Sequence, residues 1–399
     1  MITRYTRQHR VLASRRSASL RTACLWLWAL GGLAMTGCHS AGTAPTIEPD
    51  QQSQADRQRQ LFGEFDIPRK IGTVENVGLQ IPVVSPDGRQ MLYLRTDCES
   101  LSPMTLLGST DPQDTPPGRT LSIWIRPVEG SGVGQQLSKC SWAHSPTWSR
   151  SGAAVACAAG NPPHCDIVHI DMASGKATIL GLPGTVNCLP RFDVDDRTLL
   201  FCSGERAKGP FRVYRQTLDA APVALSPPGS DCLFPVTSEK TGRVLCARAN
   251  TKYLHWATCD TDGITDLIPK CGLSGRPLLL QTWAGIASPL SPDRGAVLFF
   301  DTGQNRIAVL HAAQRLVRRH RSGSIAACWI DEQTIALATP EAVFVVNTTT
   351  GVSTSLFSGS WIPSRYVPSS RRLLLLGQER AGRFSIWEVV FKGGPADTT

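Results

Sequence analysis

The stretch from Pro82 to Leu94 reads Pro-Val-Val-Ser-Pro-Asp-Gly-Arg-Gln-Met-Leu-Tyr-Leu. Two apolar runs flank its Pro-Asp-Gly triplet, and Asp-Gly supplies the positive φ that a tight hairpin turn requires. Further apolar strands are expected over 122–128 and 134–138. The stretch therefore predicts an antiparallel sheet of four short strands.

This unit recurs along the chain. Comparable hairpins, each followed by another apolar strand, have turns near positions 87, 150, 195, 240, 293, 331 and 369. Most spacings lie near the ~40–50 residues of a propeller blade with four strands. One such sheet cannot bury its faces alone, whereas radially packed sheets cover one another. We therefore predict an all-β fold, a single β-propeller of seven four-stranded blades, with a six-bladed ring as the alternative.

The ring is expected to close with a strand from near the N-terminus. Segment 69–77 precedes the first unit, and the chain ends shortly after the third strand of the seventh unit, near 384–389. The segment can supply the missing outer strand of the last blade, which removes two open sheet edges.

Several repeat positions resemble the WD40-like repeats of the TolB propeller family. They are Ser85-Pro86-Asp87-Gly88, Trp148-Ser149, Ser291-Pro292-Asp293, Ile123-Trp124 and Ile386-Trp387. The resemblance covers nearly the whole mature chain and implies a propeller. It departs from TolB in leaving no room for that protein's separate N-terminal α/β domain, so it implies a stand-alone propeller and does not carry TolB's role.

The excess positive charge belongs to the leader. The chain has 41 Lys and Arg against 32 Asp and Glu, and six of the arginines lie in residues 1–37, which contain no acid. The remainder is nearly balanced, so we expect no nucleic-acid partner. The basic start, the apolar run over 23–34 and the small residues after it have the order of a secretory signal peptide.

The leader ends in Met35-Thr36-Gly37-Cys38, which resembles a bacterial lipobox. It predicts a lipid anchor on Cys38 and a place in the bacterial cell envelope, at the outer membrane or the periplasmic face. An ordinary signal peptide with an incidental cysteine is the alternative. The predicted organisation is a lipoprotein signal peptide over 1–37, a flexible tether over 38–60, the propeller over 61–393 and a tail over 394–399.

The body carries eleven cysteines, and none of them are spaced as C-x-x-C. Many cysteines without metal-ligand spacing suggest disulfides in an oxidising compartment. The expected pairs are Cys98–Cys140, Cys157–Cys165, Cys188–Cys202 and Cys232–Cys246; a rival arrangement pairs Cys140–Cys157 and Cys98–Cys165. The remaining Cys259, Cys271 and Cys328 leave at least one buried thiol.

Catalytic motifs are missing from the sequence. It contains no G-x-S-x-G elbow, P-loop, G-x-G-x-x-G or H-E-x-x-H. Along a strand, His169 and Asp171 would face one way and Asp166 the other, so these residues do not converge on a metal. We therefore expect no catalytic residues, no metal and no cofactor, and a protein that is not an enzyme.

The predicted function is that of a non-catalytic, exported propeller that is tethered to a membrane and binds a protein or peptide partner. The proline-rich insertion over 97–119 is the candidate binding loop, and the basic run over 315–321 is either a solvated strand or a docking site for an anionic partner. Two alternatives stay open: a lyase or hydrolase with its site in the central channel, and a lectin-like carbohydrate-binding protein. An enzyme would need inward-facing His, Asp or Glu, whereas the expected first strands are mostly apolar or small.

Overall fold

The computed structural model describes eleven segments: 64–75, 82–96, 121–138, 142–160, 164–205, 210–249, 254–261, 263–268, 289–301, 306–380 and 383–392. These segments are β-strands and turns, with a single 3-10 turn, η2 (Pro368–Ser370), and no α-helix. Within them, no helix has the length and apolar character needed to cross a membrane. The all-β prediction is confirmed.

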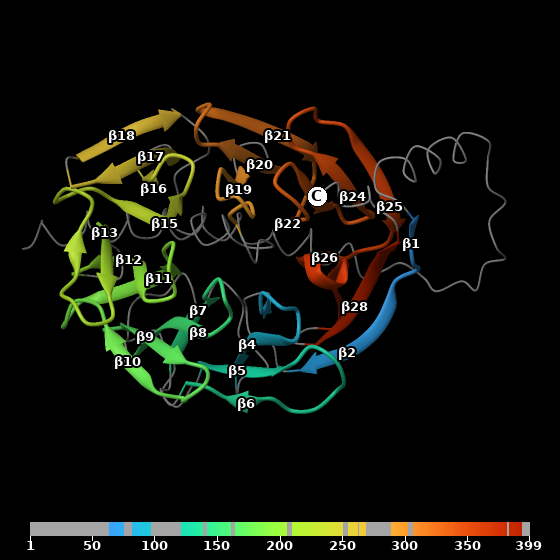
Figure 1. The fold of residues 1–399 in the computed structure, drawn as a ribbon, viewed down its shortest axis with the longest axis horizontal. Coiled ribbons are helices and arrows are strands. Elements are labelled where there is room, and N and C mark those ends of the chain that lie inside the picture. The colour runs from blue at the N-terminus through green and yellow to red at the C-terminus, as the bar shows by residue number, and fades with distance from the viewer. Residues whose placement is uncertain are drawn as a thin grey trace, which may run out of the picture. The chain divides into compact units, whose positions relative to one another are not determined.

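Seven antiparallel blades form a ring (Figure 1). Blade 1 comprises β3 (Val83–Val84), β4 (Gln90–Thr96), β5 (Leu121–Pro127) and β6 (Gln135–Gln136). Blade 2 comprises β7 (Trp142–Trp148), β8 (Ala154–Gly160), β9 (Asp166–Asp171) and β10 (Ala177–Leu180). Blade 3 comprises β11 (Val186–Phe192), β12 (Thr198–Gly204), β13 (Arg212–Thr217) and β14 (Val223–Ala224). Blade 4 comprises β15 (Cys232–Ser238), β16 (Arg243–Ala249), β17 (Leu254–Asp260) and β18 (Gly263–Ile268).

Blades 5 to 7 follow the same plan. Blade 5 has β19 (Ala296–Asp301), β20 (Arg306–His311) and β21 (Leu316–Ser322), and its first strand is marked by the bridge between Leu290 and Val297. Blade 6 has β22 (Ala326–Trp329), β23 (Thr334–Ala338), β24 (Ala342–Asn347) and β25 (Ser353–Ser358). Blade 7 has β26 (Ile362–Val367), β27 (Arg372–Arg380) and β28 (Arg383–Lys392).

The N-terminal strands complete blade 7, as predicted. β2 (Arg69–Glu75) pairs antiparallel with β28, and β1 (Glu64–Phe65) pairs with the end of the same strand. β2 also contacts blade 1, because the Gly130 amide donates to the Ile71 carbonyl at 2.8 Å and the Thr73 amide donates to the Gly130 carbonyl at 3.2 Å. β2 thus joins the last blade to the first.

The core lies between neighbouring blades. Buried apolar side chains form clusters, each of which combines residues of two adjacent blades, and every adjacent pair has one, including blade 7 with blade 1. Two tryptophans at equivalent repeat positions add hydrogen bonds to the preceding blade: Trp148 Nε1 donates to the Val83 carbonyl and Trp329 Nε1 to the Pro289 carbonyl, both at 3.0 Å. The ring is therefore closed by packing as well as by strand pairing.

The serine side chain stabilises the repeated turn through hydrogen bonds. Ser85 Oγ donates to Asp87 Oδ1 at 2.6 Å and accepts the Gln90 amide at 2.9 Å. Ser291 Oγ makes the matching bonds to Asp293 and the Ala296 amide, at 2.6 and 2.9 Å. These bonds satisfy turn groups that the strand ladder leaves unpaired.

Candidate ligand site at the inner strands

The first strands of blades 2, 3, 4, 6 and 7 are β7, β11, β15, β22 and β26, and they lie toward the middle of the ring (Figure 1). Four of them, β7, β11, β15 and β26, contain a β-bulge in the same part of the strand. In three of these bulges a residue with positive φ precedes a proline: Ser145 at 54°, Leu189 at 54° and Phe234 at 56°. Such backbone costs about 1–3 kcal/mol per residue, and bulges redirect side chains. The inner strands are therefore shaped by a repeated, costly feature.

Two arginines follow these bulges at equivalent positions. Arg191 resumes pairing opposite Leu200, and Arg365 resumes pairing opposite Leu374. Both side chains are only half-buried, yet burial lowers the pKa of Arg191 to about 10 and also lowers the pKa of Arg365. Both guanidinium groups are thus desolvated, and both belong to the first strands of their blades. Both remain cationic at neutral pH.

The hydrogen bonding of Arg365 is incomplete. Its Nε is buried and has no hydrogen-bond partner. The titratable groups that interact with it electrostatically are the Cys328 thiol of blade 6, whose pKa burial raises to about 12, and Asp87 of blade 1. A buried guanidinium donor without an acceptor is costly, so this nitrogen is suited to an oxygen ligand.

His144 lies on the inner strand of blade 2, next to its bulge. Its Nδ1 is 3.0 Å from Ser145 Oγ. Burial lowers the pKa of His144 to about 4, so the ring is neutral at pH 7. It adds an uncharged hydrogen-bonding group to the first strand of blade 2.

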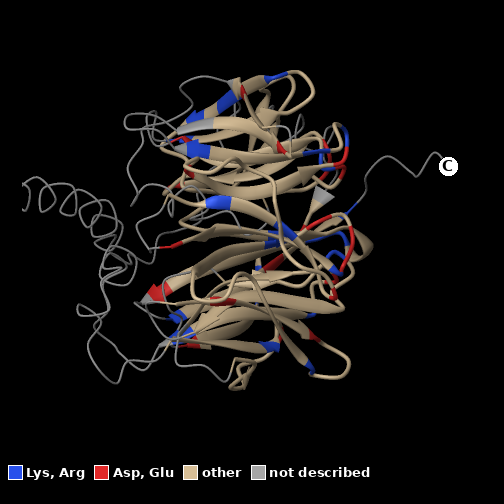
Figure 2. Ribbon diagram, turned by 90° about the vertical axis from the view of Figure 1, so that its left-hand side faces the viewer, with Lys and Arg blue, Asp and Glu red and all other residues tan. Residues whose placement is uncertain are grey.

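A network of charges links the turns of blades 2 to 5 at one end of the strands. Arg150 pairs with Glu239 at 2.9 Å, Glu239 pairs with Arg294 at 3.4 Å, and Lys240 pairs with Asp293 at 2.5 Å. Figure 2 shows acidic and basic residues close together in the turns on its right-hand side. Arg294 has a φ of 49°, is 8% exposed, and its Nη1 has no partner. The cations here are mostly compensated by acids.

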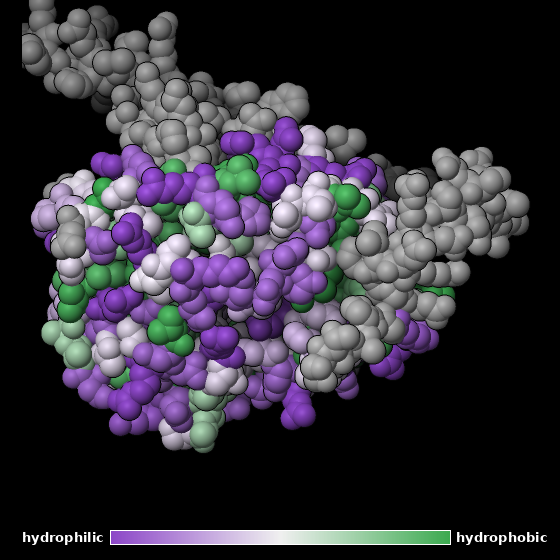
Figure 3. All heavy atoms as spheres, turned by 45° about the horizontal axis from the view of Figure 1, so that its top comes forward, coloured by the Kyte–Doolittle hydropathy of each residue, from purple (hydrophilic) through white to green (hydrophobic). Residues whose placement is uncertain are grey.

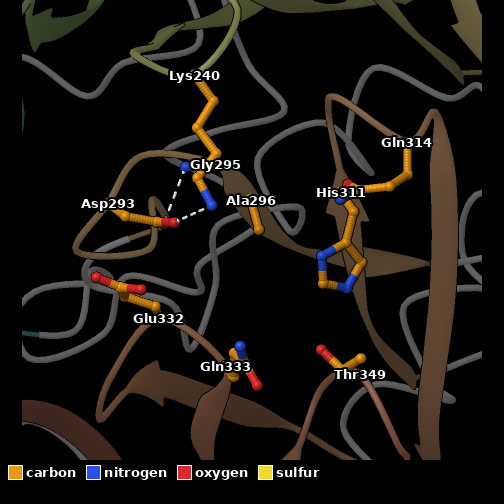
Figure 4. A pocket seen from close by; sticks show the side chains of 9 residues that line it. All are labelled: Lys240, Asp293, Gly295, Ala296, His311, Gln314, Glu332, Gln333 and Thr349. Carbon is orange, nitrogen blue, oxygen red and sulfur yellow. Dashed lines mark hydrogen bonds and ion pairs between the residues drawn. The ribbon is translucent and has the colours of Figure 1, made fainter.

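A small cavity of about 110 Å³ lies at the same end, between blades 5 and 6 (Figure 4). Figure 4 shows Lys240 and Asp293 paired on one side of it and His311 on the other; the wall is completed by Gly295, Ala296, Gln314, Glu332, Gln333 and Thr349. The hydrogen bond that Lys240 donates to Asp293 raises the pKa of Lys240. Burial lowers the pKa of His311, whose Nε2 has no partner. The cavity fits a small polar molecule, but its strongest charges already neutralise each other.

The described residues contain no group of three His, Cys, Asp or Glu side chains placed to hold a metal. Of the residues weighed as ligands in the sequence, His169 lies on β9 and packs edge-on against Phe192, with ring centroids 5.9 Å apart. The basic run is largely β21, the outer strand of blade 5, where Arg319 pairs with Asp301 at 2.7 Å and Arg321 lies over the Phe344 ring. The run is thus integrated into the blades.

Apolar docking patches are not evident on the described surface. The large exposed hydrophobic residues are spread over several blades: Ile67, Val133, Ile179, Val194, Val223, Leu316, Ile325 and Val352. Figure 3 shows hydrophobic residues as small patches within a mostly hydrophilic face. Isolated residues of this kind are normal on a protein surface.

The predicted cysteine sites are only partly visible. Cys38, Cys98, Cys140 and the insertion over 97–119 lie outside the described residues, as does Cys271. Among the eight described cysteines no disulfide is present. Cys188 lies opposite Cys202 and their thiols hydrogen-bond, and Cys232 hydrogen-bonds to Cys246. Cys157 lies opposite Val168, and Cys165 lies beside Gly160. The disulfide pairs therefore stay predictions.

Comparisons with known proteins support the fold. No protein-family model matches the sequence, and no curated protein matches it significantly. An oligogalacturonate lyase solved in complex with manganese superposes with a TM-score of 0.52 at 10% identity, covering 80% of this chain and 90% of the lyase. The oligogalacturonate lyase of Vibrio parahaemolyticus gives 0.51 at 9% identity, with 81% and 92% covered. TolB from Acinetobacter baumannii gives 0.43 at 13% identity, with 79% and 72% covered.

These neighbours correct one prediction. The expectation that this chain is not an enzyme is contradicted, since solved structures with this fold include lyases. The expectation rested on missing local motifs. In a propeller, polar groups from separate blades can converge, so an active site needs no contiguous motif. Arg191 and Arg365 are such polar groups, and they lie after bulges in first strands that the sequence suggested were mostly apolar or small.

Proposed function

We propose that this protein is an exported propeller, tethered to the bacterial envelope through Cys38, that binds an acidic segment of a protein or peptide partner at the inner arginines. The observation that carries the proposal is the placement of Arg191 and Arg365 after equivalent bulges of the inner strands. Neither position is needed to hold the sheet, because blades 2 and 4 have Thr147 and Val236 there.

The chemistry favours a carboxylate. A guanidinium presents its N–H groups in a planar fork that matches carboxylate oxygens, and such charge-assisted bonds strengthen away from bulk water. Blades 3 and 7 are separated by two blades on one side of the ring and three on the other. A ligand at the axis can therefore be contacted from two nearly opposite sides.

A binding titration tests this proposal. Fluorescence anisotropy of a labelled oligoglutamate peptide should show saturable, salt-sensitive binding, and an oligolysine peptide should show none. Replacing Arg191 or Arg365 by Gln should weaken binding by about tenfold each, since a hydrogen bond to a charged group contributes about 1.5–3 kcal/mol. Arg318→Gln, on the outer strand, is the matched control. Equal binding by the inner and outer variants would refute the proposal.

The same titration with an oligogalacturonate separates the alternatives, because two structural neighbours are oligogalacturonate lyases. Binding of the sugar in preference to the peptide would support the carbohydrate-binding alternative. Formation of an unsaturated sugar product would establish a lyase.

The tether is tested separately. Cys38→Ser should move the protein from the membrane fraction to the soluble fraction of bacteria that express it. Unchanged fractionation would show that Cys38 does not anchor the chain, and it would leave the peptide titration unaffected.

A further inference from the structure

Five cysteines lie in or against the apolar core between blades 3 and 4. The Cys202 thiol hydrogen-bonds to Cys188 and interacts electrostatically with Cys232. The Cys246 thiol hydrogen-bonds to both Cys232 and Cys259. All five lie in or against one apolar cluster. We call Cys188, Cys202, Cys232, Cys246 and Cys259, in that order, the thiol row.

Solvent reaches one end of the row. Cys188 is half-buried, whereas Cys202, Cys232 and Cys246 are 0% exposed and Cys259 is 1% exposed. A reagent in solution can therefore meet Cys188 first, and the inner thiols can react only through their neighbours.

The pairs in the row differ in geometry. Cys188 and Cys202 are directly opposite in the β11–β12 ladder, where Cα atoms are about 4.5–5.5 Å apart, within the range of a disulfide. Cys246 is diagonal to its neighbours, because Cys232 lies opposite Arg248 and Cys259 lies opposite Val244. Diagonal Cα distances of about 7–8 Å exceed the usual range for a disulfide, so a bond to Cys246 requires backbone movement. Bonds to Cys246 would form with some backbone adjustment and would exchange readily.

We propose that the thiol row is a disulfide relay, which accepts an oxidising equivalent at Cys188 and passes it inward to Cys246 and Cys259. The oxidant is an external disulfide. The Cys188 thiolate attacks one of its sulfurs and releases the first thiolate; Cys202 then attacks the Cys188 sulfur and releases the second. The two protons of Cys188 and Cys202 go to the two released thiolates. The external disulfide is reduced to two thiols and Cys188–Cys202 is oxidised.

The remaining steps are exchanges without net oxidation. Cys232 attacks Cys202 and Cys188 leaves; Cys246 attacks Cys232 and Cys202 leaves; Cys259 attacks Cys246 and Cys232 leaves. In each step one S–S bond forms, one breaks, and the proton of the attacking thiol passes to the leaving sulfur. Each attack joins neighbours in the row, so no sulfur has to cross the core.

Cys232 is the sulfur best suited to the middle of the relay. The hydrogen bond from Cys246 lowers the pKa of Cys232, and Ser230 and Arg248 act in the same direction. Burial raises the pKa of Cys202. A thiol with the lower pKa is both more often a thiolate and the better leaving group. Exchange through Cys232 is thus favoured in both roles.

A time course of oxidation tests the relay independently of the proposed ligand. The reduced, folded full chain is mixed with oxidised glutathione, quenched with acid, alkylated with N-ethylmaleimide and mapped by mass spectrometry without reduction. Cys188–Cys202 should appear first and then decline as Cys232–Cys246 and Cys246–Cys259 accumulate. A wild-type protein that stops at Cys188–Cys202 would overturn the relay, whatever the variants do.

Variants locate the entry and the end of the relay. Cys188→Ser should abolish the inner disulfides in protein that circular dichroism shows to be folded, and Cys259→Ser should stop the relay at Cys232–Cys246. Cys328→Ser is the matched control, because that thiol is equally buried but lies in blade 6. Inner disulfides that form in Cys188→Ser at the wild-type rate would contradict entry at Cys188.

Discussion

Gly72 lies in β2 where that strand touches blade 1, and its replacement by Ala should loosen the closure of the ring. A Cβ at this position would lie 2.5 Å from the Gly130 carbonyl oxygen and 2.8 Å from that of Val128. Both obstacles are backbone atoms, so no side-chain movement can make room. β2 must shift away from the turn at Val128–Gly130.

The cost follows from the bonds that this shift breaks. The hydrogen bonds from Gly130 to Ile71 and from Thr73 to Gly130 are lost, at about 1 kcal/mol each. The side chains of Val74 and Val128, both within the cluster shared by blades 7 and 1, also separate in part. We expect the free energy of unfolding to fall by about 2–3 kcal/mol.

Urea denaturation followed by tryptophan fluorescence measures this change. Gly132→Ala is the matched control, because a Cβ there meets nothing within 4 Å and its φ is not positive. That variant should keep the wild-type midpoint or exceed it slightly, as the unfolded chain loses freedom. Equal midpoints for the two variants would show that β2 does not close the ring as described.

Three further changes test other parts of the fold. Trp329→Phe removes the indole bond to the buried Pro289 carbonyl and should cost about 1–3 kcal/mol in a thermal melt, more than Trp361→Phe, whose indole bond is exposed. Burial lowers the pKa of His320 to about 4. Below pH ~6.5 the unfolded chain therefore binds a proton at this histidine, whereas the folded chain binds it only near pH 4. Stability should therefore fall by roughly 3 kcal/mol between these pH values, and urea midpoints of His320→Gln should fall less. Arg365→Met should raise the free energy of unfolding by about 1 kcal/mol, since its Nε is unsatisfied, while a destabilised variant would indicate a structural role.

The fold was predictable because its signals are local and repeated. In the two Ser-Pro-Asp turns, the serine forms hydrogen bonds to residues two and five positions later in the chain. Those bonds are local, so they do not depend on the rest of the fold. The closing strand was predictable from the missing outer strand of the seventh unit. Its pairing with β28 confirms that reasoning.

The candidate site was less predictable because bulges break the alternation of the inner strands. A strict period of two does not tell which side of β11 or β26 carries its arginine once an extra residue is inserted. For the same reason, the sequence did not show which cysteines lie opposite each other. The pairs 188–202 and 232–246 have equal spacing, yet only the first is directly opposite, because the second pair lies one residue earlier relative to its bulge. The Pro after Ser145, Leu189 and Phe234 was the available signal for the bulges.

Crosslinking at the axis of the ring tests the central claim, recognition of an acidic ligand by the inner arginines, most directly. A benzophenone amino acid replaces Leu189, which lies in the β11 bulge two residues before Arg191, or Ile179, which is 71% exposed on the outer strand β10. With an oligoglutamate peptide under ultraviolet light, position 189 should give an adduct that mass spectrometry detects, and the adduct should disappear when Arg191 and Arg365 are both Gln. An adduct that forms only at position 179, or one at 189 that persists without the arginines, would contradict the account.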